Sequence, residues 1–488
     1  MRIDLQRASA RAISLPAACA AALCGCAAGP NFHEPAPIAD ATYAPAPQPA
    51  ATAQADGPGG AAQRFVPAES VGGAWWRAFD SDDLDRLVEQ ALADSPTLAQ
   101  ARMKLEQARE DYLAQAGGSE WPQVNGSVEV TRERIDPAVF GFGSLLGNRT
   151  FPPFTLYQAQ VSVSYTLDVF GANRRTLEGL AAGIDYQEYE LEAARLTLAG
   201  NVVTSVVRRA SLAVQLDLSE RMLAQQTQQL QITEQRYRAG GVAENDLLSQ
   251  RSQVEQTRAG IAPLRVQLAQ ADHQLAVFLG HTPAQGAVGV PALDALKLPT
   301  ELPLTLPSTL ARQRPDIRAS EALLHQASAN VGVATANLFP QITLTGSYGP
   351  EGTQLSHLVD VWSVSAGLTQ PIFHGGQLRA RKRSAEDAYE AAAAAYRQTV
   401  LQGLQQVADA LRALEQDALQ LGAREGAQRD AAASARVAER RYAAGGLSQL
   451  SLLDTQRQEL QTRLDRTLAQ AQRLSDTAAL YEALGGGP

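Results

Sequence analysis

The chain has 488 residues, a formal net charge of −9 and an aromatic content of only 6%. That length suffices for several domains, yet Ala, Gln, Leu, Glu and Arg dominate long stretches, which favours long helices and coiled coil over compact globular domains. The acidic balance without a basic patch excludes nucleic acid as a partner, and no run of about 18 apolar residues follows the N-terminus, which excludes a membrane-spanning helix.

The N-terminus carries a predicted signal peptide over residues 1–25. Three arginines precede an apolar stretch, which is the pattern of a leader that is removed from the mature chain. The three cysteines of the chain, Cys19, Cys24 and Cys26, all lie in this region, so the rest of the chain can hold neither a disulfide nor a cysteine metal site. We expect no metal and no cofactor.

Cys26 is the candidate lipidation site. The sequence Leu23-Cys24-Gly25-Cys26 resembles a bacterial lipobox, in which the last cysteine is freed by cleavage and acylated. The resemblance implies a covalent lipid on Cys26, and Ala27 behind it implies sorting to the outer membrane. Acyl chains tether a protein through buried methylene groups. The alternative is an ordinary secretory signal with an incidental cysteine.

An extended, Ala/Pro-rich segment is expected over residues 26–75, because such a composition cannot bury a core of its own. We expect it to run along the surface of the folded body. A helix should then begin near Asp80 and run towards Gly117, with an interruption at Pro96.

Four segments alternate apolar and small polar residues with period two, which predicts strands. They cover about 122–133, 155–168, 340–349 and 359–370. A half-buried sheet of a soluble protein would alternate in the same way. Two details favour a membrane barrel instead: each segment is about ten residues long, and aromatic residues lie near the strand ends. These candidate membrane-interface aromatics are Trp121, Phe170, Phe339 and Phe373.

The rest of the chain is predicted to be helical and duplicated. The sequence Gln235–Gly241 recurs as Arg440–Gly446, and Trp121–Val124 recurs as Phe339–Ile342. Landmarks repeated in the same order indicate two copies, over residues 76–290 and 291–488. Heptad-spaced leucines predict coiled coil in both copies, and Gly pairs at 240–241 and 445–446 mark the tips of two helical hairpins.

This pattern predicts an oligomeric α+β membrane protein. Four strands cannot close a barrel, and an open sheet edge is not tolerated in hydrocarbon. A dimer would give eight strands, whose interior fills with side chains, whereas a trimer would give twelve and leave a lumen. We therefore expect a trimeric 12-stranded β-barrel, with four strands per chain, continued by a long α-helical coiled-coil barrel.

Several motifs together resemble the TolC-like outer membrane factors. The residues Gly72–Phe79 with Leu84–Leu87 look like the opening of their first repeat, and Leu306–Ser308 with Arg314–Glu321 like that of the second. The start at Cys26–Phe32 is similar to the lipidated NodT and OprM-type branch. The resemblance implies a homotrimeric, passive exit duct for small molecules. It also implies two partners, a periplasmic membrane-fusion adaptor and an inner-membrane transporter of the resistance-nodulation-division type, alongside the outer membrane lipids.

The same resemblance assigns roles near the two tips. Asp246 and Asp454 would line a periplasmic gate, although an acid at a helix start (Asp246) and a solvated helix face (Asp454) are the alternatives. The tips themselves would dock the adaptor. The candidate docking residues are Arg236, Tyr237, Gly240, Gly241, Arg441, Tyr442, Gly445 and Gly446.

Two further points are left open by the sequence. A basic run after the fourth strand, and a shorter one after the second, could meet lipid headgroups below the barrel or simply lie on solvated helix starts: Arg379, Arg381, Lys382 and Arg383, with Arg174 and Arg175. The duct could also export proteins, or the chain could be a lipid-tethered periplasmic scaffold with a soluble sheet. An enzyme is not expected, because no catalytic constellation occurs.

Overall fold

The computed structural model describes residues 28–36, 38–45, 47–134, 152–286 and 289–486. The predicted signal peptide and Cys26 lie outside the described residues. The chain divides into two compact units, which we treat separately. Unit 1 comprises Met1–Glu34, Leu105–Tyr186 and Glu321–Ala395, and unit 2 comprises Pro35–Lys104, Gln187–Ser320 and Tyr396–Pro488.

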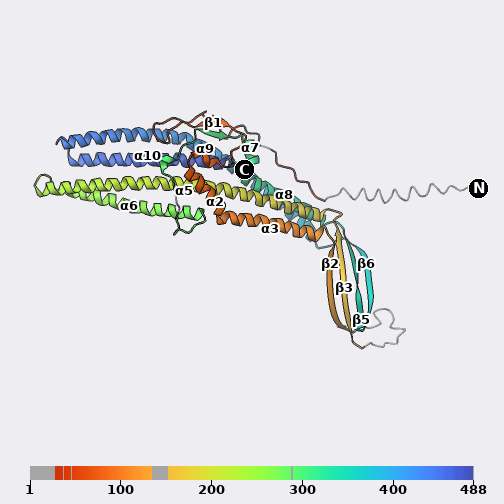
Figure 1. The fold of residues 1–488 in the computed structure, drawn as a ribbon. Helices are drawn as coiled ribbons and strands as arrows, with labels where there is room; N and C mark the ends of the chain where they lie inside the picture. Colours follow the sequence, from red (N-terminus) through yellow and green to blue (C-terminus); the bar gives the residue numbers. More distant parts are fainter. Residues whose placement is uncertain (1–27, 37, 46, 135–151, 287–288, 487–488) are drawn as a thin grey trace, which may run out of the picture. The chain divides into compact units, whose positions relative to one another are not determined.

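Long helices and two small sets of strands make up the described chain (Figure 1). In chain order the elements are β1 (Arg64–Pro67), η1 (Trp75–Phe79), α2 (Asp82–Asp94), α3 (Pro96–Ser119), β2 (Gln123–Glu133), β3 (Phe154–Leu167), α5 (Ala172–Arg238), α6 (Glu244–Phe278), η3 (Leu293–Ala295), β4 (Glu301–Leu304), α7 (Pro307–Gln313), α8 (Pro315–Ala336), β5 (Gln341–Gln354), β6 (His357–Thr369), α9 (Gln377–Ala443) and α10 (Gln449–Ala483). Within the described residues, no helix combines the length and the apolar character needed to cross a lipid bilayer.

Unit 1 contains one antiparallel sheet in the order β2-β3-β5-β6. The strand β5 is longer than its alternation predicts: it continues to Gln354, and only two residues connect it to β6. Pro350 and Gly352 made this stretch resemble a loop. Gly352 instead permits the close approach of the strands, because a Cβ atom there would lie 2.4 Å from the carbonyl oxygen of His357. The register shift between Glu351 and Gln354 absorbs the irregularity.

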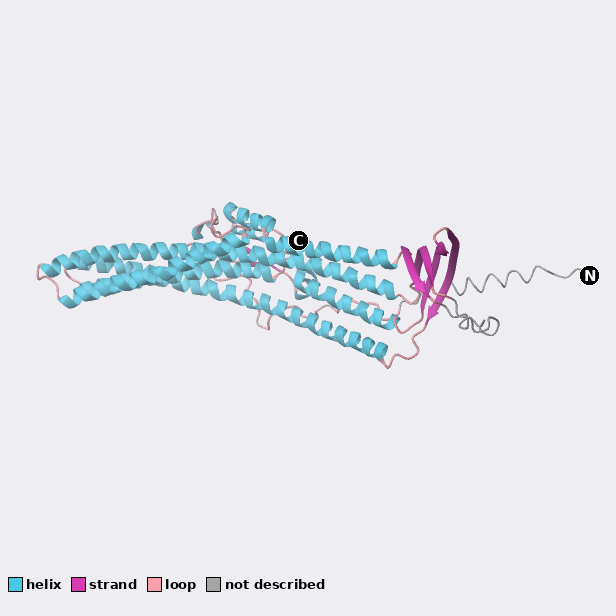
Figure 2. Cartoon of the chain, turned by 90° about the horizontal axis from the view of Figure 1, so that it is seen from below, coloured by secondary structure: helices cyan, strands magenta, loops and turns pink. Residues whose placement is uncertain are grey.

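Unit 2 is built on two helical hairpins, α5 with α6 and α9 with α10. Figure 2 shows these four helices running side by side. The duplication is visible in their contacts: Arg251 donates to Glu234 at 2.8 Å within the first hairpin, and Gln456 donates to Glu439 at 3.3 Å at the same place in the second. The predicted heptad seam of α9 is buried, at Val407, Leu411, Leu414, Ala418 and Leu421.

A parallel pair of short strands, β1 and β4, joins two parts of unit 2 that no sequence pattern linked. Beside it the described residues of the segment up to residue 75 are mostly exposed or half-buried, as on a surface course, but a few of them are buried. Thr52 and Gln63 are buried, and Trp75 stacks on Tyr481 with ring centroids 5.5 Å apart. An Ala/Pro-rich composition hid these contacts, because most of them are polar or use single aromatic residues.

The fully buried guanidinium of Arg473 on α10 holds this segment. Its Nη1 atom donates to the carbonyl oxygen of Gly59 at 2.8 Å, and its Nη2 atom donates to that of Ala61 and to Thr52 Oγ1, both at 2.9 Å. Burial lowers the pKa of Arg473, and the nearby carboxyls of Asp417 and Glu425 act in the opposite direction. Arg473 thus makes three of the hydrogen bonds that hold the N-terminal segment on α10, beside the bond from Gln63 Nε2 to Thr477 Oγ1 at 3.1 Å.

The carboxyl of Asp417 on α9 is also buried in unit 2. Desolvation, together with the hydrogen bond and the charge of Asp476, raises the pKa of Asp417 to about 7. The folded chain thus binds more protons at this site than the unfolded chain between about pH 4 and pH 7. Across that window stability should fall as pH rises, because the slope follows the difference in bound protons.

We predict that Asp417→Asn removes this pH dependence. An amide keeps the size of the side chain without the desolvation penalty, so the melting temperature should rise by roughly 2–5 °C at pH 8 and change little at pH 4. Thermal unfolding in detergent at both pH values measures it. The exposed Asp409 on the same helix serves as control as Asp409→Asn. Equal shifts at both pH values would contradict the interpretation.

Candidate functional site

The sheet of unit 1 has one apolar and one polar face. The register places Val128 opposite Ala159, Val161 opposite Tyr348, and Tyr348 opposite Trp362, so the apolar residues of all four strands share a face. That face is uncovered in the single chain: the exposed fractions are 82% for Val128, 80% for Val364 and 71% for Trp362. An apolar surface of this kind marks an interaction with lipid or protein.

Small hydroxyl groups line the opposite face. Thr345 Oγ1 lies 2.7 Å from Ser365 Oγ, and Ser347 Oγ lies 2.9 Å from Ser363 Oγ across neighbouring strands. Within the described residues, β2 and β6 each have a single strand neighbour, so both edges of the sheet are open. One chain therefore has a two-faced sheet with free backbone groups at each side.

All four predicted interface aromatics lie at the same end of the sheet. Trp121 precedes β2, Phe170 follows β3, Phe339 precedes β5 and Phe373 follows β6, and antiparallel order brings these strand ends together. Phe170 and Phe339 stack with ring centroids 4.9 Å apart. Trp121 and Phe373 are exposed, 69% and 86% respectively. Exposed aromatic side chains in such a row suit a membrane–water interface.

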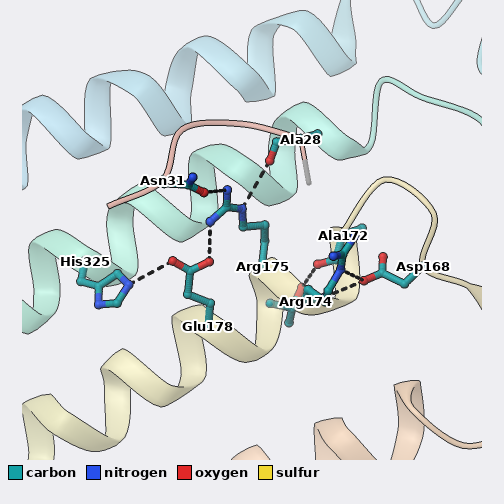
Figure 3. A network of polar contacts seen from close by, with 9 residues as sticks. Ala28, Asn31, Asp168, Ala172, Arg174, Arg175, Glu178 and His325 are labelled. Atoms are coloured by element: carbon teal, nitrogen blue, oxygen red, sulfur yellow. Dashed lines mark hydrogen bonds and ion pairs between the residues drawn. The ribbon is translucent and has the colours of Figure 1, made fainter. Parts of the chain in front are cut away.

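The first described residues are attached at this end of the sheet, and Figure 3 shows Ala28 and Asn31 beside Arg175. The backbone N–H of Ala28 donates to the carbonyl oxygen of Phe170 at 2.9 Å. Arg175 donates through Nε to the carbonyl oxygen of Ala28 at 3.4 Å and through Nη2 to Asn31 Oδ1 at 2.6 Å. Phe32 stacks on His325, with ring centroids 4.4 Å apart. We call residues 28–32, held in this way, the N-terminal clamp.

The carboxylate of Glu178 binds Arg175, the side chain that holds the N-terminal clamp. Glu178 accepts a hydrogen bond from Arg175 Nη1 at 2.6 Å and lies 3.0 Å from His325 Nε2. Burial opposes ionisation of Glu178, but the hydrogen bonds of Arg175 and His325 outweigh it and lower the pKa of the carboxyl. Arg175 itself is only 5% exposed, so both alternatives from the sequence, contact with lipid headgroups and a solvated helix start, are wrong for this residue. Its guanidinium instead makes its hydrogen bonds and its ion pair inside the protein.

Two glycines allow the clamp to lie close to α8. Gly29 has φ +89°, and a Cβ atom there would lie 2.5 Å from Gly332 Cα. A side chain on Gly332 would in turn meet Arg175 at 2.8 Å. The sequence analysis identified the motif around Gly29. It did not predict that Gly332, on a helix far along the chain, lies against it.

The two hairpin tips have the same geometry. Gly240 and Gly445 both have φ +75°, and each ends its helix in the left-handed conformation that glycine adopts without strain. Gly241 N–H donates to the carbonyl oxygen of Arg236, and Gly446 N–H to that of Arg441, both at 2.8 Å. These are the bonds of a Schellman motif, so each pair of glycines forms a tight C-cap.

The tips of the two hairpins also touch. Arg236 Nη1 donates to Tyr442 Oη at 2.8 Å, and its guanidinium lies 5.5 Å from the centre of that ring. Gln229 donates to the same hydroxyl at 3.3 Å, and Gln449 on α10 donates to the hydroxyl of Thr233 on α5. Of the predicted docking residues, the structure thus brings Arg236 and Tyr442 together.

The predicted gate residues lie on different hairpins. Asp246 is half-buried in the first turn of α6, where a negative charge is favoured next to the free N–H groups. Asp454 is exposed on α10 and forms an ion pair with Arg457, with the nitrogen and oxygen 3.3 Å apart. One chain supplies a single carboxylate at each of these two positions, so a ring of carboxylates would require further copies.

Comparisons with known proteins agree with this architecture. The outer membrane efflux protein family matches residues 87–281 and 306–486. The chain is similar to the pyoverdine export outer membrane protein OpmQ of Pseudomonas putida, with 31% identity over 85% of this chain and 88% of that protein. It is also similar to a probable outer membrane lipoprotein, SilC, of Salmonella typhimurium, with 30% identity over 84% and 88%.

Among solved structures, the outer-membrane channel OprN superposes with a TM-score of 0.82 at 29% identity, covering 95% of this chain and 99% of that one. The family and the TolC-like channel fold expected from the sequence are therefore confirmed, with four strands per chain and two family repeats. The chain belongs to the outer membrane efflux protein family, whose members are passive, non-enzymatic channels of the outer membrane.

Proposed function

We propose that three copies of this chain form one exit duct of a tripartite efflux pump. Their sheets close a twelve-stranded β-barrel in the outer membrane, and their helical hairpins form a coiled-coil tube in the periplasm. A periplasmic membrane-fusion adaptor docks at the tips, and an inner-membrane transporter of the resistance-nodulation-division type supplies the energy. The duct itself performs no chemistry.

The observation that carries this proposal is the uncovered sheet of unit 1. Its apolar face is exposed, and β2 and β6 leave backbone groups free at both edges. In a bilayer the apolar face meets lipid, and pairing of β2 with β6 of the next copy satisfies both edges. Twelve strands leave a lumen lined by the hydroxyl face, whereas eight strands would fill their own interior.

The cargo in this proposal is a small molecule. The relative OpmQ is named for export of pyoverdine, which favours small solutes over proteins. The inner face carries hydroxyl groups together with the carboxylates of Glu129 and Glu351, which favour cations over anions, and the inner-membrane transporter makes the finer selection among solutes. Drugs and other toxic compounds then share one exit.

We predict that the purified protein is a detergent-dependent trimer that conducts ions, even when an ordinary secretory leader replaces the lipoprotein signal and Cys26 is replaced by serine. The barrel, and not the lipid, then holds it in the membrane. Native mass spectrometry and planar-bilayer conductance measure the two properties. A stable monomer in buffer without detergent would overturn the proposal.

Lipidation of Cys26 fits the N-terminal clamp. One residue, Ala27, separates Cys26 from Ala28, and two residue steps span at most about 7 Å. Ala28 is hydrogen-bonded to Phe170, one of the interface aromatics. An acyl group on Cys26 would therefore enter the inner leaflet beside the barrel wall, and the clamp would hold the anchor there.

We predict that Arg175→Met frees the N-terminal clamp. The substitution removes the donors to Ala28 and Asn31 and the ion pair of Arg175 with Glu178, which keeps only its contact with His325. Hydrogen exchange of residues 28–36 should accelerate at least about tenfold, since a broken buried charged pair costs several kcal/mol. Arg174→Met is the matched control, because Arg174 is 53% exposed. Equal exchange in both variants would contradict the role of Arg175.

The gate proposal concerns Asp246 and Asp454. In a trimer each would bring three carboxylates near one axis, where mutual repulsion and bound cations set the passage of ions. Arg457 is close enough to moderate the charge of Asp454. We propose that these acids narrow the resting periplasmic end and favour cations.

Asp246→Ala and Asp454→Ala should each raise single-channel conductance, by about twofold, and lower the preference for cations over anions. The control is Glu255→Ala, because Glu255 is exposed and paired with an arginine three residues later, as Asp454 is. Single-channel conductance and ion selectivity of the variants in planar bilayers measure both effects. Unchanged conductance in both aspartate variants would rule out an acidic gate.

A further inference from the structure

The two helices that continue the edge strands of unit 1 are uncovered in the single chain. The central helices α5 and α8 pack on each other, and Gln326 Nε2 on α8 donates to the carbonyl oxygen of Gly179 on α5 at 3.2 Å. By contrast, no residue of α3 from 106 to 119 is buried, and none of α9 from 377 to 395. The helix α3 leads into β2, and α9 follows β6. The helical part of unit 1 therefore has two open sides, as its sheet has.

Helix geometry identifies a charged residue on the open side of each of these helices. On α3, the half-buried Tyr112 marks the side that faces the rest of the chain, and Glu110 lies about 160° around the helix from it. On α9, Leu378 and Ala385 are half-buried, and Arg383 lies about 140–160° from them. Glu110 and Arg383 are both exposed, and within the described residues neither has an ion-pair partner.

In the proposed trimer the two open sides meet. Pairing of β2 with β6 of the neighbouring copy brings α3 of one copy beside α9 of the next, with the helices antiparallel. Glu110 precedes the end of α3 by nine residues and Arg383 follows the start of α9 by six, so they lie about 14 and 9 Å along their helices from the sheet. An extended arginine side chain spans that difference. Gln107 and Asp387, at about 18 and 15 Å, form a second matched level with the same offset in direction.

We infer that Glu110 of one copy and Arg383 of the next form an ion pair that fixes the register of the strands between copies. This inference rests on the proposed trimeric duct. Within the chain a two-residue turn sets the register of β5 and β6, whereas no turn connects β6 to β2 of the next copy. A slip of two residues there keeps the apolar face outward and shifts the strands by about 7 Å. Alternation cannot exclude that slip, but the ion pair can, because the slip separates its charges.

Anionic lipid headgroups are the competing partner of Arg383. The charges that follow on α9 favour the neighbouring chain instead, because Glu386, Asp387 and Glu390 come within two turns and are repelled by an anionic lipid surface. The helix α3 suits both signs. It offers the carboxylate of Glu110 near the level of Arg383 and an amide donor, Gln107, near that of Asp387.

Exchange of the two charges tests the pair. Glu110→Arg or Arg383→Glu alone places like charges at all three contacts between copies. Each should lower the temperature at which half of the trimer dissociates in detergent by roughly 5–10 °C, less at high salt, and the double exchange should recover most of the loss. Arg381→Glu is the matched control, because Arg381 lies about 160° around α9 from Arg383.

The register itself is measured by unitary conductance in planar bilayers. Barrels of different register differ in shear and therefore in bore, so the single exchanges should give several conductance levels where the natural chain and the double exchange give one. A single unchanged level in both single exchanges would overturn the inference. So would a double exchange that fails to restore the trimer while Arg383→Glu weakens binding of phosphatidylglycerol in native mass spectra, since Arg383 would then bind lipid.

Crosslinking tests the proximity of the two helices directly. Glu110→Cys with Arg383→Cys, in the chain with a secretory leader and Cys26→Ser, leaves these as the only cysteines of the mature protein. A short bifunctional methanethiosulfonate reagent should give a covalent trimer on a denaturing gel, whereas Glu110→Cys with Arg381→Cys should stay monomeric. A protein that is trimeric by native mass but does not crosslink through the first pair would overturn the inference alone. A protein that is not trimeric would refute the proposed function, and the inference with it.

Discussion

Unpaired backbone groups at the edges of a single sheet constrain this protein more than any other interaction. A strand at a sheet edge presents a row of N–H and carbonyl groups, and hydrocarbon offers them no partner. The chain has two such edges, β2 and β6, on a sheet whose apolar face is uncovered. Association of copies through these edges satisfies the backbone and places the apolar face outward in one step. In the proposed trimer the lumen is a consequence of that requirement.

The helices are duplicated as the strands are, and a comparison of the two repeats shows where their side chains differ. The glycine caps at the two tips are nearly superimposable in their hydrogen bonds. Around them the polar residues differ: Asp246 corresponds to Ser451, and Thr233 to Ala438. The backbone at the tips is thus retained in both repeats, while the side chains that decide charge and contact are assigned to one repeat or the other.

The sequence predicted the parts of the fold that show a short repeating pattern of apolar residues or a local signal such as a glycine pair. Alternation located the four strands, heptads located the seam of α9, and glycine pairs located the tips. It did not predict the pairing of β1 with β4, because two four-residue segments more than 200 residues apart have no periodic signal. It ended β5 early, because Pro350 and Gly352 favour a loop locally and only the neighbouring strand holds them in the sheet. Of the site, it identified the tip residues, but for Arg175 it offered only lipid headgroups or solvent and missed the contacts with Ala28, Asn31 and Glu178.

Arg175 and Arg473 show why the N-terminal segment could not be understood from its composition. The segment has little apolar surface, so hydrophobic patterning gives it no place in a core. Arg473 holds it mainly through the main-chain carbonyl oxygens of Gly59 and Ala61, which every sequence has, whereas Arg175 combines the carbonyl oxygen of Ala28 with the side chain of Asn31. A guanidinium has five donors in one plane, so a single side chain can hold a whole turn of backbone.

The cost of burying such a cation must be offset by a carboxylate nearby. Glu178 serves Arg175 directly, whereas Asp417 and Glu425 act on Arg473 through charge alone. The two arrangements therefore differ in their response to pH. The carboxyl of Glu178 has a lowered pKa and stays ionised, so the N-terminal clamp keeps its ion pair in neutral and mildly acidic conditions. Asp417, with a pKa of about 7, loses its charge in the same range and leaves Arg473 held by its carbonyl partners. The attachment of the segment in unit 1 is electrostatic and insensitive to mild acid, and that in unit 2 depends chiefly on neutral hydrogen bonds.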